Sequence, residues 1–401
     1  GNAARQTRRR LLQPGSGASC RHLPSFVRLC GVASHLMGWQ SKDGGGTRPL
    51  GKPTVLDRLI QQSIAQVLTP LYDPTFSEHS HGFRPMRSAH GAIGEMLESG
   101  NKIGTKCHVV DCDLKAFFDT VDHQKLMARL RQRTTDPGLL ALILNYLKAG
   151  AISQEGRYEE SLRGVPQGGP LSPLMANILL DELDDQLEER GHKFVRYADD
   201  FVILCRSQRA GQRILRSVRR FLADKLKLIV NEAKSRVVEL AEASFLGFKI
   251  VRRKVRWTEK SQKKFKAKVK QITKRTRGHS PKKVIAELQS YLRGSVNYYG
   301  LGIAFGEARE LDKWVRRRMR LYYWKQWGRP RTRRRKLLKL GIGRDEVHKA
   351  SRSRKGHWRM SQNSLVQRAL TNGWLTEQGV PSLTEQWVSI RYPDGSKGKP
   401  G

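Results

Sequence analysis

Two adjacent aspartates, Asp199 and Asp200, separate two short runs of apolar, β-branched and aromatic residues. The runs at 193–196 and 201–204 are typical of strands, so the Tyr-Ala-Asp-Asp segment between them is predicted to be a tight turn. Neighbouring carboxylates repel each other, which is costly unless a divalent cation neutralises them. The pattern favours a metal-binding turn, with ordinary surface acids as the alternative.

A second predicted strand, starting at Val109, also ends in acids. If it lies beside the first pair of strands in one sheet, Asp113 converges with Asp199 and Asp200. Three carboxylates form an oxygen-rich site suited to Mg²⁺. Two such ions can hold an attacking hydroxyl and a leaving pyrophosphate in line. Three nearby acids are expected to be solvated or hydrogen-bonded instead: Asp111, Asp119 and Asp122.

The net charge indicates a polyanionic partner. The chain has 76 Lys and Arg against 36 Asp and Glu, a formal net charge of +40. RNA or DNA is the natural partner, and its binding should weaken steeply with salt. A membrane is not expected, because no apolar run approaches the ~20 residues that span a bilayer. The five cysteines form no C-x-x-C pair, so a zinc site or disulfide framework is not expected and a reducing cytoplasm is the default compartment.

Several longer segments resemble one known family. The Tyr-Ala-Asp-Asp turn, the segment from Asp113 to Asp119 and the segment from Gly164 to Pro173 are similar to reverse transcriptase palm motifs. The closer resemblance is to the group II intron reverse transcriptases, or maturases, in the bacterial branch that lacks an endonuclease domain. It runs from about Lys42 to about Ile390 and is carried by Arg48-Pro-Leu-Gly-Lys-Pro, His81-Gly-Phe-Arg-Pro, Tyr291-Leu-Arg-Gly-Ser-Val-Asn-Tyr-Tyr and Gly356-His-Trp-Arg.

The resemblance implies an α+β fold of the right-hand polymerase type. Fingers and an antiparallel palm sheet are expected over residues 42–250, and a helical thumb or maturase region over 251–330. A small basic, nucleic-acid-binding extension is expected over 331–401, and residues 1–41 form an unassigned basic tail. The implied activity is RNA-templated synthesis of DNA from deoxynucleoside triphosphates on a DNA primer with two Mg²⁺ ions, together with binding of the intron RNA to assist splicing and mobility.

The resemblance also implies roles for individual residues. Leu114 joins Asp113, Asp199 and Asp200 at the metal site. Lys42 and Arg48 would hold the triphosphate. The remaining nucleotide-binding residues would be Phe118, which excludes a 2′-hydroxyl, Gln167 at the new base pair and Lys234 beside the leaving pyrophosphate. Template or primer contacts are assigned to Arg84, Gly168, Gly169, Phe245, Leu246 and Gly247.

Each of these roles has a structural alternative. The basic side chains could be ordinary surface charges in a very basic protein. Phe118 could belong to the core, as is expected of its neighbour Phe117, which points to the opposite face. The Gln167–Gly169 segment could be a plain turn.

Two helices are predicted within the expected fingers and palm. Thr54 can cap the first, with Asp57 at its third position. Its apolar stripe is expected to comprise Val55, Leu56, Leu59, Ile60, Ile64, Val67 and Leu68. The second helix starts at Ser172 and continues through the acidic run from Asp181 to Glu189, which is expected to be a solvated face.

The last third is predicted to bind nucleic acid. Residues 252–277 carry 13 Lys or Arg and one acid, Glu259, and residues 313–336 carry 12 Lys or Arg and no acid. Lys and Arg side chains at this density can bind successive phosphates of a nucleic acid, while aromatic side chains pack in the protein core or stack on nucleobases. The aromatics of the second stretch are divided between these roles, with the core favoured for Trp314 and Trp324; the others are Tyr322, Tyr323 and Trp327.

The N-terminal 42 residues contain no acid and match no fingers element of the family. A fragment or out-of-frame end is the preferred interpretation; a basic arm and an organellar transit peptide are alternatives. Three rival functions stay open: an RNA-binding splicing helper without polymerase activity, a domesticated reverse transcriptase of a defence or diversity-generating system, and an inactive relic. The intron, the DNA target, the host and the oligomeric state cannot be inferred from the sequence.

Overall fold

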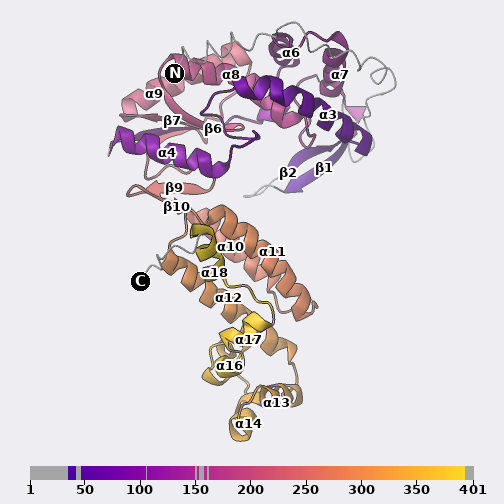
Figure 1. The fold of residues 1–401 in the computed structure, drawn as a ribbon, viewed down its shortest axis with the longest axis vertical. Helices are drawn as coiled ribbons and strands as arrows, with labels where there is room; N and C mark the ends of the chain where they lie inside the picture. Colours follow the sequence, from indigo (N-terminus) through magenta and orange to yellow (C-terminus); the bar gives the residue numbers. More distant parts are fainter. Residues whose placement is uncertain are drawn as a thin grey trace. The chain divides into compact units, whose positions relative to one another are not determined.

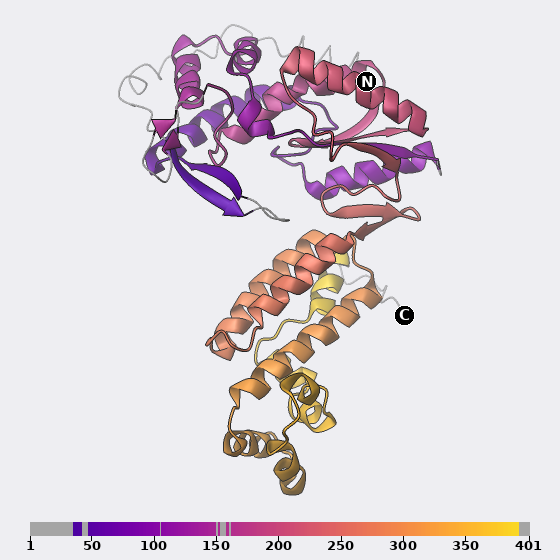
Figure 2. The same cartoon turned by 180° about the vertical axis from the view of Figure 1, so that it is seen from behind.

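The computed structural model describes residues 35–41, 47–104, 106–149, 151–152, 158–159 and 162–392 (Figures 1 and 2). Before Pro53, and in the two short segments between Ala151 and Glu159, it describes the backbone alone. The chain divides into two compact units, Gly1–Leu246 and Gly247–Gly401. Finer domain boundaries stay a prediction.

The first unit is built around an antiparallel sheet with strand order β6-β7-β3-β8. Apolar alternation and β-branched residues make these strands, as the sequence predicts. This palm sheet, together with the helical second unit, confirms the α+β right-hand fold. The strands are β3 (His108–Cys112), β6 (Lys193–Tyr197), β7 (Asp200–Cys205) and β8 (Arg236–Glu239).

Helices cover both faces of the palm sheet (Figure 1). A Cβ on Gly211 of α9 (Gln208–Phe221) would lie 3.2 Å from Cys205 Sγ, whereas one on Gly100 of α4 (Ala89–Ile103) would lie 3.7 Å from Leu204 Cδ2. Successive residues of a strand point to opposite faces, so α9 and α4 lie on opposite sides. This explains why β7 is buried from Phe201 to Cys205.

The remaining elements of the first unit lie around this sheet. A second small sheet has the order β2-β1-β4-β5. Its strands are β1 (His35–Ser41), β2 (Thr47–Lys52), β4 (Ala151–Ile152) and β5 (Tyr158–Glu159). The helices are α3 (Val55–Tyr72), α5 (Phe117–Thr120), α6 (His123–Arg131), α7 (Pro137–Lys148) and α8 (Ser172–Glu189), with a 3₁₀ turn at Asp73–Thr75 and a π-helical turn at Leu222–Leu226.

Helix α3 begins as predicted, because Thr54 Oγ1 accepts a hydrogen bond from Asp57 N at 3.1 Å. Its predicted apolar stripe is wrong in part. Asp57 and Gln61 are buried together with Ile64 and Leu68, and the Asp57 carboxylate accepts bonds from the Thr54 and Tyr146 hydroxyls at 2.6 and 3.4 Å. These hydrogen bonds compensate for the burial of the Asp57 carboxylate. Four residues of the predicted stripe are exposed instead: Val55, Leu56, Leu59 and Val67.

Over its described residues, 247–392, the second unit is helical apart from one hairpin of β9 (Phe248–Val251) and β10 (Lys254–Trp257). Helix α18 packs against α11 and α12, so the C-terminal helices belong to the same compact unit as the thumb helices. The helices are α10 (Glu259–Ile272), α11 (Pro281–Tyr299), α12 (Phe305–Gln326), α13 (Pro330–Lys339), α14 (Arg344–Ser351), α15 (His357–Met360), α16 (Ser364–Ala369), α17 (Asn372–Glu377) and α18 (Leu383–Arg391).

The aromatics of α12 belong to the core of this unit. Tyr322, Tyr323, Trp324 and the following Trp327 are all buried, so the predicted core position of Trp324 is confirmed and base stacking by the other three is excluded. Trp314 is half-buried. Among the described helices of both units, none is long and apolar enough to cross a membrane.

Candidate active site

The Asp199–Asp200 segment is the tip of the β6–β7 hairpin. Tyr197 pairs with Asp200, and Ala198 and Asp199 form the turn. Ala198 adopts a positive φ of 58°, the sign that tight hairpin turns require. In the neighbouring strand Cys112 pairs with Phe201. Asp113, which follows β3, therefore lies at the same end of the sheet as Asp200, the first residue of β7. The register therefore brings together the acids that the sequence analysis selected.

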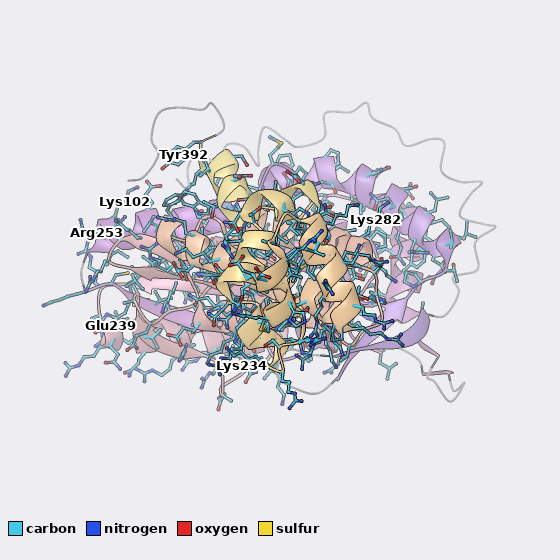
Figure 3. The ribbon with its side chains drawn as sticks, turned by 90° about the horizontal axis from the view of Figure 1, so that it is seen from below. Lys102, Lys234, Glu239, Arg253, Lys282 and Tyr392 are labelled. Atoms are coloured by element: carbon cyan, nitrogen blue, oxygen red, sulfur yellow. The ribbon has the colours of Figure 1, made fainter. Side chains whose placement is uncertain are left out.

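Asp113 is held by the loop that precedes β8. Asn231 Nδ2 donates to Asp113 Oδ2 at 2.9 Å, and Lys234 Nζ lies 3.3 Å from the same oxygen (Lys234 is labelled in Figure 3). The main chain is fixed as well, because Asn231 N donates to Asp113 O at 2.8 Å and Asp113 N donates to Ser235 Oγ at 3.1 Å. The lysine predicted near the leaving pyrophosphate thus lies beside the first aspartate.

The carboxylates repel one another. Burial, followed by repulsion from Asp199, Asp113 and Asp111, raises the pKa of the Asp200 carboxyl to about 6. Burial also raises the pKa of Asp111. The guanidinium of Arg236, 4.0 Å from the Asp111 carboxylate, partly offsets this increase. Asp200 is exposed to solvent, so salt screens much of this repulsion. The carboxylates therefore concentrate negative charge at this site, and a bound cation would reduce the repulsion between them.

The donor chemistry fits Mg²⁺, which prefers carboxylate oxygens. A divalent cation would also remove the repulsion that raises the pKa of Asp200. The side chains are not preassembled, however: in the described part of the chain no three acidic, His or Cys side chains are grouped around one point. Asp113 Oδ2 is engaged by Asn231 and Lys234 instead.

The raised pKa of Asp200 predicts a pH-dependent stability difference. A carboxyl whose pKa is higher in the folded than in the unfolded state stabilises the fold below about pH 4, and this contribution is lost as pH rises through about 6. In Mg²⁺-free buffer at low salt, Asp200→Asn should therefore raise the Tm relative to the wild type more at pH 7 than at pH 4.5. Thermal unfolding at both pH values measures this, and adding Mg²⁺ at pH 7 should narrow the gap. A difference independent of pH would contradict the repulsion.

A buried ion pair supports the turn from below. Arg196 and Asp184 are both fully buried, and Arg196 Nη2 lies 2.6 Å from Asp184 Oδ2. Arg196 Nη1 donates to Asn177 Oδ1 at 2.9 Å and to Ala198 O, in the turn itself, at 3.0 Å. The guanidinium therefore links α8 to the backbone that carries Asp199.

The predicted solvated face of α8 is wrong at this point. Asp181 and Asp184 are buried, because Arg129 reaches Asp181 at 3.2 Å and Arg196 reaches Asp184. Glu188 accepts a hydrogen bond from Ser77 Oγ at 2.5 Å. A sequence signal was present: four polar residues recur at helical spacing on one stripe, Asn177, Asp181, Asp184 and Glu188.

The His81–Pro85 motif packs directly on the turn. His81 N donates to Arg196 O at 2.8 Å, and Asn177 Nδ2 donates to Gly82 O at 2.9 Å. A Cβ on Gly82 would lie 2.2 Å from Ala198 N and 2.9 Å from Tyr197 C. Any side chain here would push against the main chain of the aspartate hairpin.

We therefore expect Gly82→Ala to reduce the primer extension that the sequence resemblance implies at least about tenfold, because displacing the turn by a fraction of an ångström misaligns the carboxylates. Gly94→Ala is the matched control: Gly94 lies on α4 with nothing within 4 Å of its added Cβ. That change should leave activity intact and stabilise the helix by up to about 1 kcal/mol. Steady-state primer extension and thermal unfolding of both variants provide the measurement. Equal activity in the two variants would contradict the packing argument.

The candidate nucleotide residues Phe118 and Gln167 belong to two segments that are joined. Gly164 N donates to Val121 O at 2.7 Å, and Gln167 Nε2 donates to Asp119 Oδ1 at 2.9 Å. Phe118 is half-buried, whereas Phe117 beside it is buried. Their roles in binding a nucleotide stay predictions.

Other predicted site residues are placed differently. Arg84 is used internally: its guanidinium binds Asp73 Oδ1 at 2.7 Å and the Ser80 carbonyl at 2.9 Å, which favours the structural alternative to a template contact. Lys42 lies outside the described residues, and Arg48 lies in β2, where only the backbone is described.

Gly168, Leu246 and Gly247 lie in turns, Gly169 follows the first of these turns, and Phe245 is a bridge residue. Gly168 has φ of 114°, and a Cβ on Gly169 would lie 2.3 Å from Gln61 Oε1, so a structural reason for Gly169 exists. Leu114 is buried and forms a bridge with Val230. Phe245 and Leu246 end the first unit, and Gly247 begins the second with φ of 80°.

An antiparallel palm sheet with acids at the ends of two adjacent strands is the fold of the right-hand polymerase class. Residues 40–250 match the reverse transcriptase (RNA-dependent DNA polymerase) family, and residues 262–341 match the maturase-specific domain of group II introns. The chain belongs to the reverse transcriptase family and carries a group II intron maturase-specific domain.

Two curated relatives have similar sequences. The chain is 32% identical to Protein YkfC of Escherichia coli over 257 residues, 54% of this chain and 67% of that protein. It is 30% identical to the group II intron-encoded protein LtrA of Lactococcus lactis over 274 residues, 52% of this chain and 45% of LtrA, so it spans about half the length of that relative. A telomerase from Candida tropicalis superposes over 91% of this chain and 68% of that chain with a TM-score of 0.46 and 11% identity.

Proposed function

We propose that this protein is the RNA-directed DNA polymerase of a group II intron and that it also binds the intron RNA to assist splicing and mobility. The observation that carries the proposal is the β3–β7 register. It brings Asp113 to the Asp199–Asp200 turn in a chain of the reverse transcriptase family.

In the proposed reaction a primer 3′-hydroxyl attacks the α-phosphate of a deoxynucleoside triphosphate. A new O–P bond forms, the hydroxyl proton is released, and pyrophosphate leaves with the electrons of the broken bond. Asp113, Asp199 and Asp200 would hold two Mg²⁺ ions, which supply charge neutralisation at the attacking and leaving oxygens.

The basic side chains have complementary proposed roles in that reaction. Lys234 is exposed and beside Asp113, where its charge can stabilise the leaving pyrophosphate. Lys42 and Arg48 are proposed to hold the triphosphate, and Gln167 to contact the new base pair. The positive charges offset the negative charge that accumulates as the pyrophosphate separates.

The RNA-binding surface of the second unit is proposed to consist of its exposed Lys and Arg side chains. Helix α10 and the residues flanking it present eleven exposed Lys and Arg between residues 252 and 275, and α13 presents five. The arginines of α12 are used differently. Arg316 pairs with Asp312 at 3.0 Å, Arg318 Nε donates to Thr273 Oγ1 at 2.9 Å and Arg320 Nε to Leu370 O at 2.8 Å, so they hold the helices together.

A primer-extension assay on an RNA template, run beside a splicing assay with a group II intron RNA, tests the proposal. Synthesis that depends on both the template and Mg²⁺ supports it. The second candidate is a splicing helper without polymerase activity. It is favoured by the engagement of Asp113 with Asn231 and Lys234. Splicing assistance without any primer extension would establish that alternative.

The predicted sugar gate can be examined separately. Phe118→Ala should increase incorporation of ribonucleotides at least about tenfold, because the ring that would sit under the sugar is removed and a 2′-hydroxyl fits. The ratio of kcat/KM for dNTP and rNTP measures it. Phe117→Leu is the control: Phe117 is buried and in edge-to-face contact with Phe118, so its change affects packing but not the sugar ratio. Unchanged discrimination in Phe118→Ala would remove the gate role.

A further inference from the structure

The solvent side of α9 carries a row of arginines. Arg209, Arg213, Arg216 and Arg220 follow one another at spacings of four, three and four residues, so they lie on one face of the helix. All four are exposed, and the helix contains no Asp or Glu. At 1.5 Å per residue the row extends about 16 Å.

No other part of the described chain neutralises this arginine row. None of its four side chains has a hydrogen bond or ion pair to a described residue. The neighbouring bases that are used structurally are different ones: Arg219 pairs with Glu232 at 2.9 Å, and Arg190 donates to Ser217 Oγ at 2.5 Å.

The row is also rigidly presented. The opposite face of α9 is anchored on the palm sheet through Gly211, Ile214 and Val218, all of which are buried. At Gly211 a Cβ would lie 2.5 Å from Val237 Cγ1 and 3.2 Å from Cys205 Sγ, so the helix sits close to the strands. Four positive charges at fixed spacing are therefore held on a stable element.

We propose that the arginine row binds the phosphate backbone of a duplex segment of structured RNA. This deepens the proposed function, on which it rests, by adding an RNA contact on the palm unit. The charges recur every ~4.5–6 Å along the helix, comparable in scale to the ~3.4 Å axial spacing of charges on one duplex strand. No aromatic residue is exposed on α9, so the base-stacking platform typical of single-strand binding is missing from this helix. Duplex RNA is instead recognised by shape and phosphates.

The test compares two variants of the full chain with equal loss of charge. The first replaces the row: Arg209→Gln, Arg213→Gln, Arg216→Gln and Arg220→Gln, which keeps helix propensity nearly constant. The control removes four exposed bases scattered over other parts of the first unit: Lys102→Gln, Lys106→Gln, Lys125→Gln and Arg131→Gln. The probe is a labelled RNA hairpin with a fully paired stem, titrated at several salt concentrations.

We expect the row variant to bind the hairpin at least about tenfold more weakly, with the slope of log affinity against log salt reduced by about 3. The control variant should change less than about threefold. Retained primer extension on a short primer–template shows that the row variant is folded, since α9 carries no residue of the active site.

Equal losses in the two variants would mean that only net charge matters and would overturn the proposal. Unchanged hairpin binding by the row variant would do so as well. A loss restricted to binding of anionic lipid vesicles would assign the row to a membrane surface instead. If the wild-type protein binds no RNA at all, the proposed function fails with the inference, which separates that result from the others.

Discussion

Replacing Asp199 by asparagine should reduce primer extension on an RNA template by about 10³-fold or more. The reason is that a carboxylate which holds a metal contributes several kcal/mol of stabilisation to the charge of the transition state, and about 4 kcal/mol corresponds to 10³ in rate. Asparagine keeps the shape and size of the side chain, so the turn between Tyr197 and Asp200 is preserved. Single-nucleotide incorporation in Mg²⁺ measures the loss.

The same substitution should not weaken the fold. Repulsion from Asp199 contributes to the raised pKa of Asp200, so removing that charge should lower the pKa of Asp200 and leave the Tm unchanged or higher. Binding of an RNA hairpin should stay within about threefold of the wild type, because the exposed bases are untouched. A variant that keeps near-normal synthesis would refute the assignment of the metal to this turn.

Replacing Arg196 by methionine should destabilise the first unit by about 3–5 kcal/mol, since it leaves Asp184 buried without a partner. It also removes the donor to Ala198 O, so activity should fall together with stability. Seven of the eight tryptophans follow residue 247, so tryptophan fluorescence reports mainly on the other unit. Hydrogen exchange of the peptides that cover β6 and β7 is the appropriate measurement.

A double variant separates stability from positioning. Arg196→Met with Asp184→Leu replaces the pair by apolar side chains of similar size and should recover most of the lost stability. It cannot restore the hydrogen bond to Ala198 O, so activity should recover less than protection from exchange does. Lys102→Met, which breaks the exposed pair with Glu98, should cost less than about 1 kcal/mol. A stability loss of less than about 1 kcal/mol for Arg196→Met would contradict the proposed role of the buried ion pair.

Local features of the chain could be predicted because they depend on near neighbours. The hairpin that carries Asp199 follows from two strand-like runs around a short polar turn, and the Thr54 cap of α3 follows from residues three positions apart. The strand that precedes Asp113 was recognisable for the same reason. Its pairing with β7 was a conditional prediction, and the register in the structure meets the condition.

Features that depend on partners distant in the sequence were predicted poorly. The acids of α8 were predicted to be a solvated face because their partners, Arg129 and Arg196, lie outside the helix, and the helical spacing of the polar residues does not identify them. The buried face of α3 contains Asp57, because Tyr146 from α7 supplies a donor.

The aromatics after residue 321 show the same effect in the second unit. Tyr322 and Tyr323 are buried in the helical unit and do not form a stacking surface. Helical spacing alone cannot tell which side of a helix with both bases and aromatics is covered, because the covering helices come from other parts of the chain.

The order of residues along the chain was enough to predict a cation site, since adjacent carboxylates between strand-like runs repel each other unless a cation is bound. The net charge of +40 was enough to predict a polyanionic partner. The folded chain was needed to show which acids lie at the same end of the palm sheet, which acid pairs with a buried arginine, and which arginines of α9 have no partner among the described residues. Burial and ion pairing depend on distances between residues far apart in the chain, and strand pairing and helix packing set those distances.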